Sequence, residues 1–245
     1  MTCSHQTIIQ KNIEQISQQI HEAELRYSRE PHSVQLLAVS KTKPIEALQA
    51  AIDAGQRRFG ENYVQEGVDK IQHFEQHYSQ CKLEWHFIGP IQSNKTRLIA
   101  ENFDWVHSVD REKIAQRLND QRGERNQNGE KNPLQVLIQV NTSGETSKSG
   151  TNHDQVFALA ELINALPNLT LRGLMSIPEH VPDYASQLAA FEKLAQLKTQ
   201  LQARYPQVDT LSMGMSGDIQ AAIEAGSTMV RIGTAIFGQR DYQNK

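Results

Sequence analysis

Eight short apolar segments recur along this chain, and segments with helical periodicity separate most of them. The apolar segments cover residues 36–40, 58–62, 85–89, 105–109, 135–141, 171–177, 210–216 and 229–237. Several carry apolar residues on both faces, as do parallel strands that helices cover on both sides. Eight strand–helix units in 245 residues are typical of a closed (β/α)8 TIM barrel. An open, doubly wound sheet is the alternative, but eight regular units favour closure, so we predict an α/β barrel.

The segments between the strands, and one segment before them, predict helices. Ile9, Ile13, Ile16 and Ile20 recur at helical spacing among polar residues, which predicts an extra N-terminal helix laid against the barrel. Further helices are expected at 44–54, 156–166, 187–205 and 218–225. By contrast, the polar, low-complexity stretch 121–133 predicts an exposed loop.

The composition is ordinary for a soluble globular protein, and it argues against several functional classes. The net charge is -3 and no basic block occurs, so we expect no nucleic-acid partner. The apolar runs are too short to cross a bilayer and the N-terminus lacks a signal-peptide pattern, so we expect no membrane association and a cytoplasmic location. Two cysteines predict neither a disulfide framework nor a metal site. Since no linker and no long exposed apolar stripe is evident, we expect one domain over residues 1–245 and a monomer.

Lys41 stands at the end of the first predicted strand, between the apolar run 36–40 and Pro44. Proline ends a strand and can begin a helix, so Lys41 falls at the turn between the two. A lysine at this point has two interpretations. It is a surface residue whose stem follows apolar surface, or it is an amine held for a Schiff base with a carbonyl compound. In a TIM barrel the active face lies at the C-terminal ends of the strands, where Lys41 is expected.

The turns that follow the seventh and eighth predicted strands are rich in glycine and hydroxyl residues. Phosphate sites in these barrels often use those two turns. Ser216, at the end of the strand 210–216, and Thr234 can each donate a hydroxyl group, while Gly233 lets the backbone approach an anion. The alternative is that both are ordinary turns with capping residues.

Arg231 lies in an otherwise apolar strand, where a guanidinium needs an acid or a ligand as its partner. A lysine at a strand end, a phosphate site and a buried arginine together suggest a phosphorylated aldehyde. Pyridoxal 5'-phosphate (PLP) is the common cofactor of that form.

The chain resembles the pyridoxal-phosphate homeostasis proteins, single-domain relatives of the alanine racemase N-terminal barrel. The resemblance runs from Leu36 to about Tyr242 and rests on the segments 38–44, 59–66, 85–95, 147–150, 211–216 and 231–238. It implies an alanine racemase-like barrel that holds PLP as a lysine aldimine and acts in intracellular PLP homeostasis, by buffering or delivery. Apoenzymes that require PLP are the recipients that it suggests.

The resemblance also assigns roles to single residues. It places the covalent aldimine on Lys41 rather than on Lys43, and the pyridine nitrogen of the cofactor against Arg231. It assigns the remaining contacts to Asn62 and His86 nearer the ring and to Ser216, Gly233 and Thr234 at the phosphate.

The same resemblance bears on catalysis. Alanine racemases carry a second, β-rich domain and take a tyrosine base from a partner subunit, whereas this chain ends at Lys245, soon after the last barrel unit. We therefore expect a non-catalytic PLP-binding protein; the alternative is a weak PLP-dependent amino-acid racemase or another PLP enzyme. Lys148, in the loop after the fifth strand, is either a solvated lysine or a guide for the departing cofactor.

Overall fold

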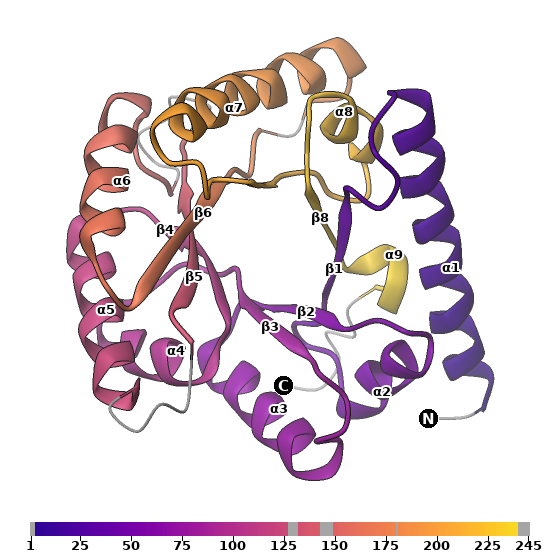
Figure 1. Ribbon diagram of the computed structural model, residues 1–245. Helices are drawn as coiled ribbons and strands as arrows, with labels where there is room; N and C mark the ends of the chain where they lie inside the picture. Colours follow the sequence, from indigo (N-terminus) through magenta and orange to yellow (C-terminus); the bar gives the residue numbers. More distant parts are fainter. Residues whose placement is uncertain (1–2, 127–131, 143–148, 180, 240–245) are drawn as a thin grey trace.

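The computed structural model describes residues 3–126, 132–142, 149–179 and 181–239, and its centre is a closed barrel of parallel strands (Figure 1). The strands are β1 Gln35–Val39, β2 Arg58–Glu61, β3 Glu84–Phe87, β4 Trp105–Val109, β5 Leu134–Gln139, β6 Leu169–Met175, β7 Thr210–Ser212 and β8 Met229–Ile232. Each strand pairs in parallel with the next in the chain, and β8 pairs with β1 to close the barrel. The predicted TIM barrel is therefore confirmed.

Helices surround the barrel on its outer face (Figure 1). They are α1 Cys3–Arg26, α2 Ile45–Asp53, α3 Val64–His77, α4 Thr96–Asn102, α5 Glu112–Asn126, α6 Val156–Ala165, α7 Tyr184–Arg204, α8 Ile219–Glu224 and α9 Thr234–Phe237. The extra N-terminal helix is confirmed, since α1 packs against α2, α8 and α9 with its four predicted isoleucines buried. No helix of the described residues is long and apolar enough to cross a membrane.

The loop predicted at 121–133 is wrong for its first six residues, because α5 continues through Asn126. Arg122 in this turn is buried, and its guanidinium donates to the carbonyl oxygens of Ala100, Phe103 and Asn132 at 2.7 to 3.0 Å. The polar composition led to the prediction of a loop, but the segment is helical. The hydrogen-bond donors of its buried arginine are satisfied by backbone carbonyls from neighbouring segments. Residues 127–131 of this stretch lie outside the described residues.

The last two strands are shorter than predicted, and this moves the predicted phosphate residues from strands into turns. β7 ends at Ser212, and Gly214 adopts φ +103°, a backbone conformation that glycine tolerates and other residues rarely adopt. Ser216 therefore follows the strand instead of ending it. β8 likewise ends at Ile232, and α9 begins at Thr234.

Alternate side chains of the strands point to opposite sides of the barrel wall. In β4, Val106 packs in the large core between strands and helices, while Trp105 packs with Leu137 and Met175 in a separate cluster. His107 alternates with Val106 and is fully buried. The barrel therefore contains buried polar groups alongside its apolar ones.

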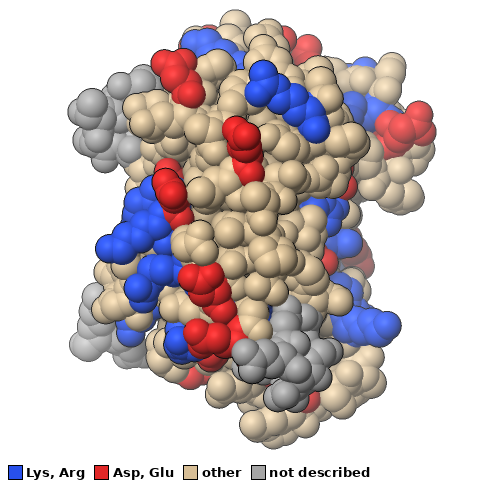
Figure 2. All heavy atoms as spheres, turned by 60° about the vertical axis from the view of Figure 1, so that its left-hand side comes forward, with Lys and Arg blue, Asp and Glu red and all other residues tan. Residues whose placement is uncertain are grey.

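On the molecular face that Figure 2 shows, acidic and basic side chains are interspersed, and neither sign forms a patch that covers the face. This agrees with the small net charge of -3. A strongly basic surface, which binding to a nucleic acid backbone requires, is not seen on this face.

Candidate functional site

The C-terminal ends of the strands form what we call the mouth of the barrel, and Lys41 lies there, two residues after β1. Its side chain is half-buried, and the next residue, Thr42, adopts φ +63°. The nearby Lys43 is used differently, because its Nζ donates to the carbonyl oxygens of Phe237, Gly238 and Gln239 at 3.2, 3.0 and 2.9 Å. Lys43 thus binds the C-terminal end of α9, where a cation is favourable. Of the two, Lys41 stays the predicted ligand amine.

A buried ion cluster holds the turn that carries Lys41. Lys70 of α3 donates from Nζ to the backbone oxygen of Ser40 at 2.7 Å, to Glu61 Oε1 at 2.8 Å and to Glu66 Oε1 at 2.6 Å. Glu66 Oε1 also accepts from the backbone N–H of Thr42 at 2.6 Å. Burial raises the pKa of Glu61, although the charge of Lys70 opposes this shift. The cluster therefore binds the residues on both sides of Lys41.

The sequence analysis did not identify Lys70. Glu66 and Lys70 stand four residues apart, which is the spacing of an ion pair on one helix face. That signal was present in the sequence, but such pairs are usually exposed, and nothing local shows that this one faces β1 and β2. Its burial, with 5% of the Lys70 side chain exposed, is a result of the fold.

Arg231 of β8 is buried, and its guanidinium donates to two uncharged oxygens. Nη1 donates to Ser212 Oγ at 2.7 Å, and Nη2 donates to the backbone oxygen of Ser176 at 2.8 Å. Burial lowers the pKa of Arg231 to about 10, although the charge of Asp218 opposes this shift. The guanidinium is therefore charged at neutral pH, and its remaining N–H groups can bind a further acceptor.

The residues predicted to bind phosphate lie in two turns that follow the neighbouring strands β7 and β8. Ser216 is exposed in the turn before α8, and Thr234 is exposed at the first position of α9. A side chain at Gly233 would come within 3.2 Å of the backbone oxygen of Val39, which favours glycine at this position. Two hydroxyl groups and a close-lying backbone thus stand at adjacent strand ends, next to β1 and Lys41.

Several buried polar atoms at the mouth have no hydrogen-bond partner among the described residues. They are Asn62 Oδ1 directly after β2, Glu61 Oε2 at the end of β2 and Ser176 Oγ directly after β6. Buried polar atoms are normally satisfied, so each such atom needs an explanation. A polar ligand bound at the mouth is an explanation that accounts for all three atoms. A cofactor with a phosphate, a phenol oxygen and a ring nitrogen is a ligand of this kind.

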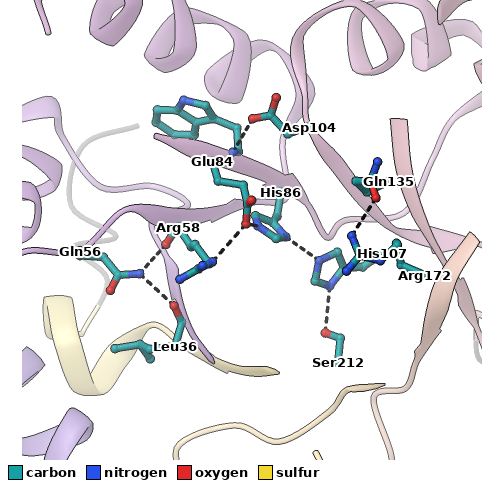
Figure 3. A network of polar contacts seen from close by, with 11 residues as sticks. Leu36, Gln56, Arg58, Glu84, His86, Asp104, His107, Gln135, Arg172 and Ser212 are labelled. Carbon is teal, nitrogen blue, oxygen red and sulfur yellow. Dashed lines mark hydrogen bonds and ion pairs between the residues drawn. The ribbon is translucent and has the colours of Figure 1, made fainter. Parts of the chain in front are cut away.

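His86 lies deeper in the barrel than its predicted place nearer the ring suggests. It is fully buried in β3, with its Nε2 2.8 Å from Glu84 Oε1 and its Nδ1 2.8 Å from His107 Nε2 (Figure 3). His107 in turn contacts Ser212, which binds Arg231. The described contacts thus connect His86 to Arg231 through two other side chains. Sequence reasoning did not identify His107, whose only signal was a histidine in an apolar strand.

Two further sequence expectations concern other parts of the chain. Lys148 lies outside the described residues. Within the described part of the chain, no group of three or more His, Cys, Asp or Glu side chains is placed to hold a metal ion.

Comparison with known proteins identifies the family. Residues 9–241 match the alanine racemase N-terminal domain family. Over 234 residues the chain is 70% identical to the pyridoxal phosphate homeostasis protein of Vibrio cholerae, a match that covers 96% of this chain and 97% of that relative. The chain belongs to the pyridoxal phosphate homeostasis protein family.

Solved structures agree with this assignment. A protein of unknown function from Bifidobacterium adolescentis superposes with a TM-score of 0.90 at 33% identity, covering 97% of each chain. PipY of Synechococcus elongatus, solved with PLP bound, superposes with a TM-score of 0.75 at 38% identity, covering 89% of this chain and 100% of PipY. The family resemblance and the alanine racemase-like fold inferred from the sequence motifs are therefore confirmed.

Proposed function

We propose that this member of the pyridoxal phosphate homeostasis protein family binds PLP at the mouth of its barrel and acts in PLP homeostasis, by buffering or delivering the cofactor. The observation that carries the proposal is the convergence at one barrel end of Lys41, buried Arg231 and partnerless polar atoms. Two relatives support it: the Vibrio cholerae protein is named for PLP homeostasis, and PipY was solved with PLP bound.

Each predicted site residue except His86, which is connected to Arg231 through His107 and Ser212, has a direct part in this proposal. Lys41 supplies the amine that would hold the aldehyde carbon covalently, and the Lys70 cluster holds its turn. Arg231 faces the pyridine nitrogen, while Asn62 lies nearer the ring. Ser216, Gly233 and Thr234 bind the phosphate through hydroxyl and backbone donors. When bound, PLP supplies an electrophilic aldehyde and an electron-withdrawing ring.

Arg231 limits the chemistry that the site can support. With a pKa of about 10, the guanidinium donates a hydrogen bond at neutral pH and keeps its proton. A ring nitrogen that receives a hydrogen bond but no proton is a weak electron sink, which suits a protein that holds the cofactor or a racemase whose carbanion is short-lived. Relatives named for PLP homeostasis support the first, so we propose a non-catalytic role; a weak amino-acid racemase or another PLP enzyme is the alternative.

The remaining parts of the proposal concern the setting of this function. We propose that the whole chain, residues 1–245, acts as one cofactor-binding domain, as a monomer in the cytoplasm. Its partners are PLP and, as recipients, apoenzymes that require PLP. The match to full-length relatives, which covers 97% of the Vibrio cholerae protein, supports a single functional unit.

The decisive experiment is the absorption spectrum of the purified protein with PLP, before and after borohydride reduction, with the modified peptide mapped. We expect the reduced cofactor on the peptide that contains Lys41. A modified Lys43 peptide would contradict the assignment, and absence of bound PLP would contradict the function. Incubation with L-amino acids in deuterated water tests the alternative, because rapid exchange of the α-hydrogen would show an enzyme.

A further inference from the structure

A line of hydrogen-bonded side chains runs from the N-terminal end of the barrel to Arg231, and the proposed cofactor contacts use only its last member. Glu84 Oε1 is 2.8 Å from His86 Nε2, and His86 Nδ1 is 2.8 Å from His107 Nε2. His107 Nδ1 is 2.9 Å from Ser212 Oγ, which accepts from Arg231 Nη1 at 2.7 Å. Figure 3 shows this line from Glu84 to Ser212. We call these five residues the relay.

The two ends of the relay impose the same direction on its hydrogen bonds. At the outer end, burial alone would raise the pKa of Glu84, but the hydrogen bond from His86 and the charge of Arg58 lower it, so Glu84 is an ionised acceptor. His86 must then carry its hydrogen on Nε2 and accept at Nδ1 from His107 Nε2–H. At the inner end Arg231 can only donate, so the Ser212 hydroxyl turns its own hydrogen toward His107 Nδ1. Each of the other four members therefore donates its hydrogen bond in the direction of Glu84.

The relay has no place for an additional proton. A second hydrogen on either imidazole would put two N–H groups against each other, or an N–H against the Ser212 hydroxyl hydrogen. Burial lowers the pKa of His86, although Glu84 opposes this. Burial and the charge of Arg231 hold the pKa of His107 well below its usual range, and a charge on His86 would lower it further. Trp105 stacks against His86 at an interplanar angle of 13° and confines its ring. Both histidines are therefore neutral and fixed in one tautomer.

The relay has a geometric consequence for Arg231. A guanidinium is planar, so bonds from Nη1 to Ser212 and from Nη2 to the backbone of Ser176 together determine the plane in which its other N–H groups point. With its hydrogen directed to His107, the Ser212 oxygen presents a lone pair to Nη1. The hydrogen-bond direction that Glu84 imposes at the outer end thus favours the observed position of the guanidinium at the mouth.

We propose that Glu84, His86, His107 and Ser212 are positioning residues that orient the Arg231 guanidinium toward the ring nitrogen of a bound pyridine cofactor. This inference rests on the proposed function, because a bound PLP would supply the ring nitrogen that accepts from the oriented N–H groups of Arg231. It adds a set of residues, most of them outside the mouth, that govern the geometry of the site without contacting the cofactor.

The first test observes the tautomers in the full-length protein without added PLP. Two-bond ¹H–¹⁵N correlation spectra are expected to show His86 and His107 as neutral imidazoles with the hydrogen on Nε2 at neutral pH, since both are buried. A hydrogen on Nδ1 of either ring, or a charged His107 at neutral pH, would overturn the relay. This readout needs neither a variant nor a bound cofactor.

The second test breaks the relay and measures PLP binding and the pH midpoint of the bound-cofactor absorption bands. His107→Phe removes the acceptor of the Ser212 hydrogen, so we expect about tenfold weaker binding, the loss typical of a hydrogen bond to a charged group, and a shifted midpoint. Glu84→Gln keeps an oxygen acceptor for His86, so its effect should be smaller than that of Glu84→Leu. The matched control is Leu137→Ala, which destabilises the packing beside Trp105 without removing a relay bond.

The outcomes separate this role from the proposed function. Wild-type affinity and midpoint in His107→Phe, or an equal shift in Leu137→Ala, would overturn the positioning role and leave PLP binding intact. If the unchanged protein does not bind PLP, the proposed function fails as well. A shift of the pH midpoint in His107→Phe, with no shift in Leu137→Ala, supports the positioning role of the relay.

Discussion

Charged side chains pair at both ends of the barrel, whereas three of the buried polar atoms without a partner among the described residues lie at the mouth and one, Ser33 Oγ, lies just before β1 at the opposite end. Arg58 lies 3.2 Å from Glu84, and Arg172 lies 2.7 Å from Asp209 and over the ring of Trp105. At the mouth, Asn62 Oδ1 and Ser176 Oγ are buried with no hydrogen-bond partner among the described residues. Because buried polar atoms are normally satisfied, these two support the proposal that the cofactor binds at the mouth.

The largest expected effect tests the mouth directly. Lys41→Ala should abolish covalent attachment of PLP, because it removes the amine, whereas Lys43→Ala should retain it, because that amine binds the carbonyl oxygens at the end of α9. The measurement is the mass of the borohydride-reduced protein after incubation with PLP. Equal attachment in Lys41→Ala and the unchanged protein would contradict the assignment.

A second prediction concerns the buried ions beneath the mouth. Lys70→Met leaves Glu61 buried without its cation, so we expect a loss of about 3–5 kcal/mol in the free energy of unfolding. Urea unfolding at pH 7 measures it, and Lys113→Met, at an exposed position on α5, is the control. A loss below about 1 kcal/mol would show that the cluster does not hold the Lys41 turn.

A third prediction uses the relay that joins the two ends. The pKa of His107 is well below that of an unfolded histidine, near 6.5, so the unfolded state binds more protons as the pH falls below that value. Stability therefore falls with acid between pH 6.5 and 5, by at most about 1.4 kcal/mol per pH unit for this histidine. Over the same pH interval, the free energy of unfolding of His107→Phe should fall by about that much less than the free energy of unfolding of the unchanged protein. Parallel losses in the two proteins would mean that His107 is not kept neutral.

The smallest effect is expected at the N-terminal end. Arg172→Ala removes a partly exposed pair with Asp209, a contact over Trp105 and a hydrogen bond to Gln135, so we expect a loss of about 1–1.5 kcal/mol in stability and no change in PLP affinity. Titration with PLP and urea unfolding check the two parts. A large loss of PLP affinity would break the contrast between the two barrel ends.

Much of the fold and part of the candidate site could be predicted from the sequence. Strand and helix periods predicted the barrel, and the position of Lys41 between an apolar run and Pro44 placed it at the mouth, as observed. The helical turn 121–126 was missed because polar composition resembles that of a loop until Arg122 is seen to be buried. His86 is predicted to lie nearer the ring, and its contact with His107 of β4, which the sequence did not indicate, makes it a member of the relay.

The sequence by itself determined the periods of the elements, their order and the lysine that follows the first strand, since these depend on residues close together in the chain. Only the tertiary structure decided which buried polar groups meet. Lys70 reaches the Ser40 oxygen 30 positions away, and His107 reaches Ser212 105 positions away. The physical reason is that a buried polar group is stable only with a partner, and barrel closure brings these partners from other strands.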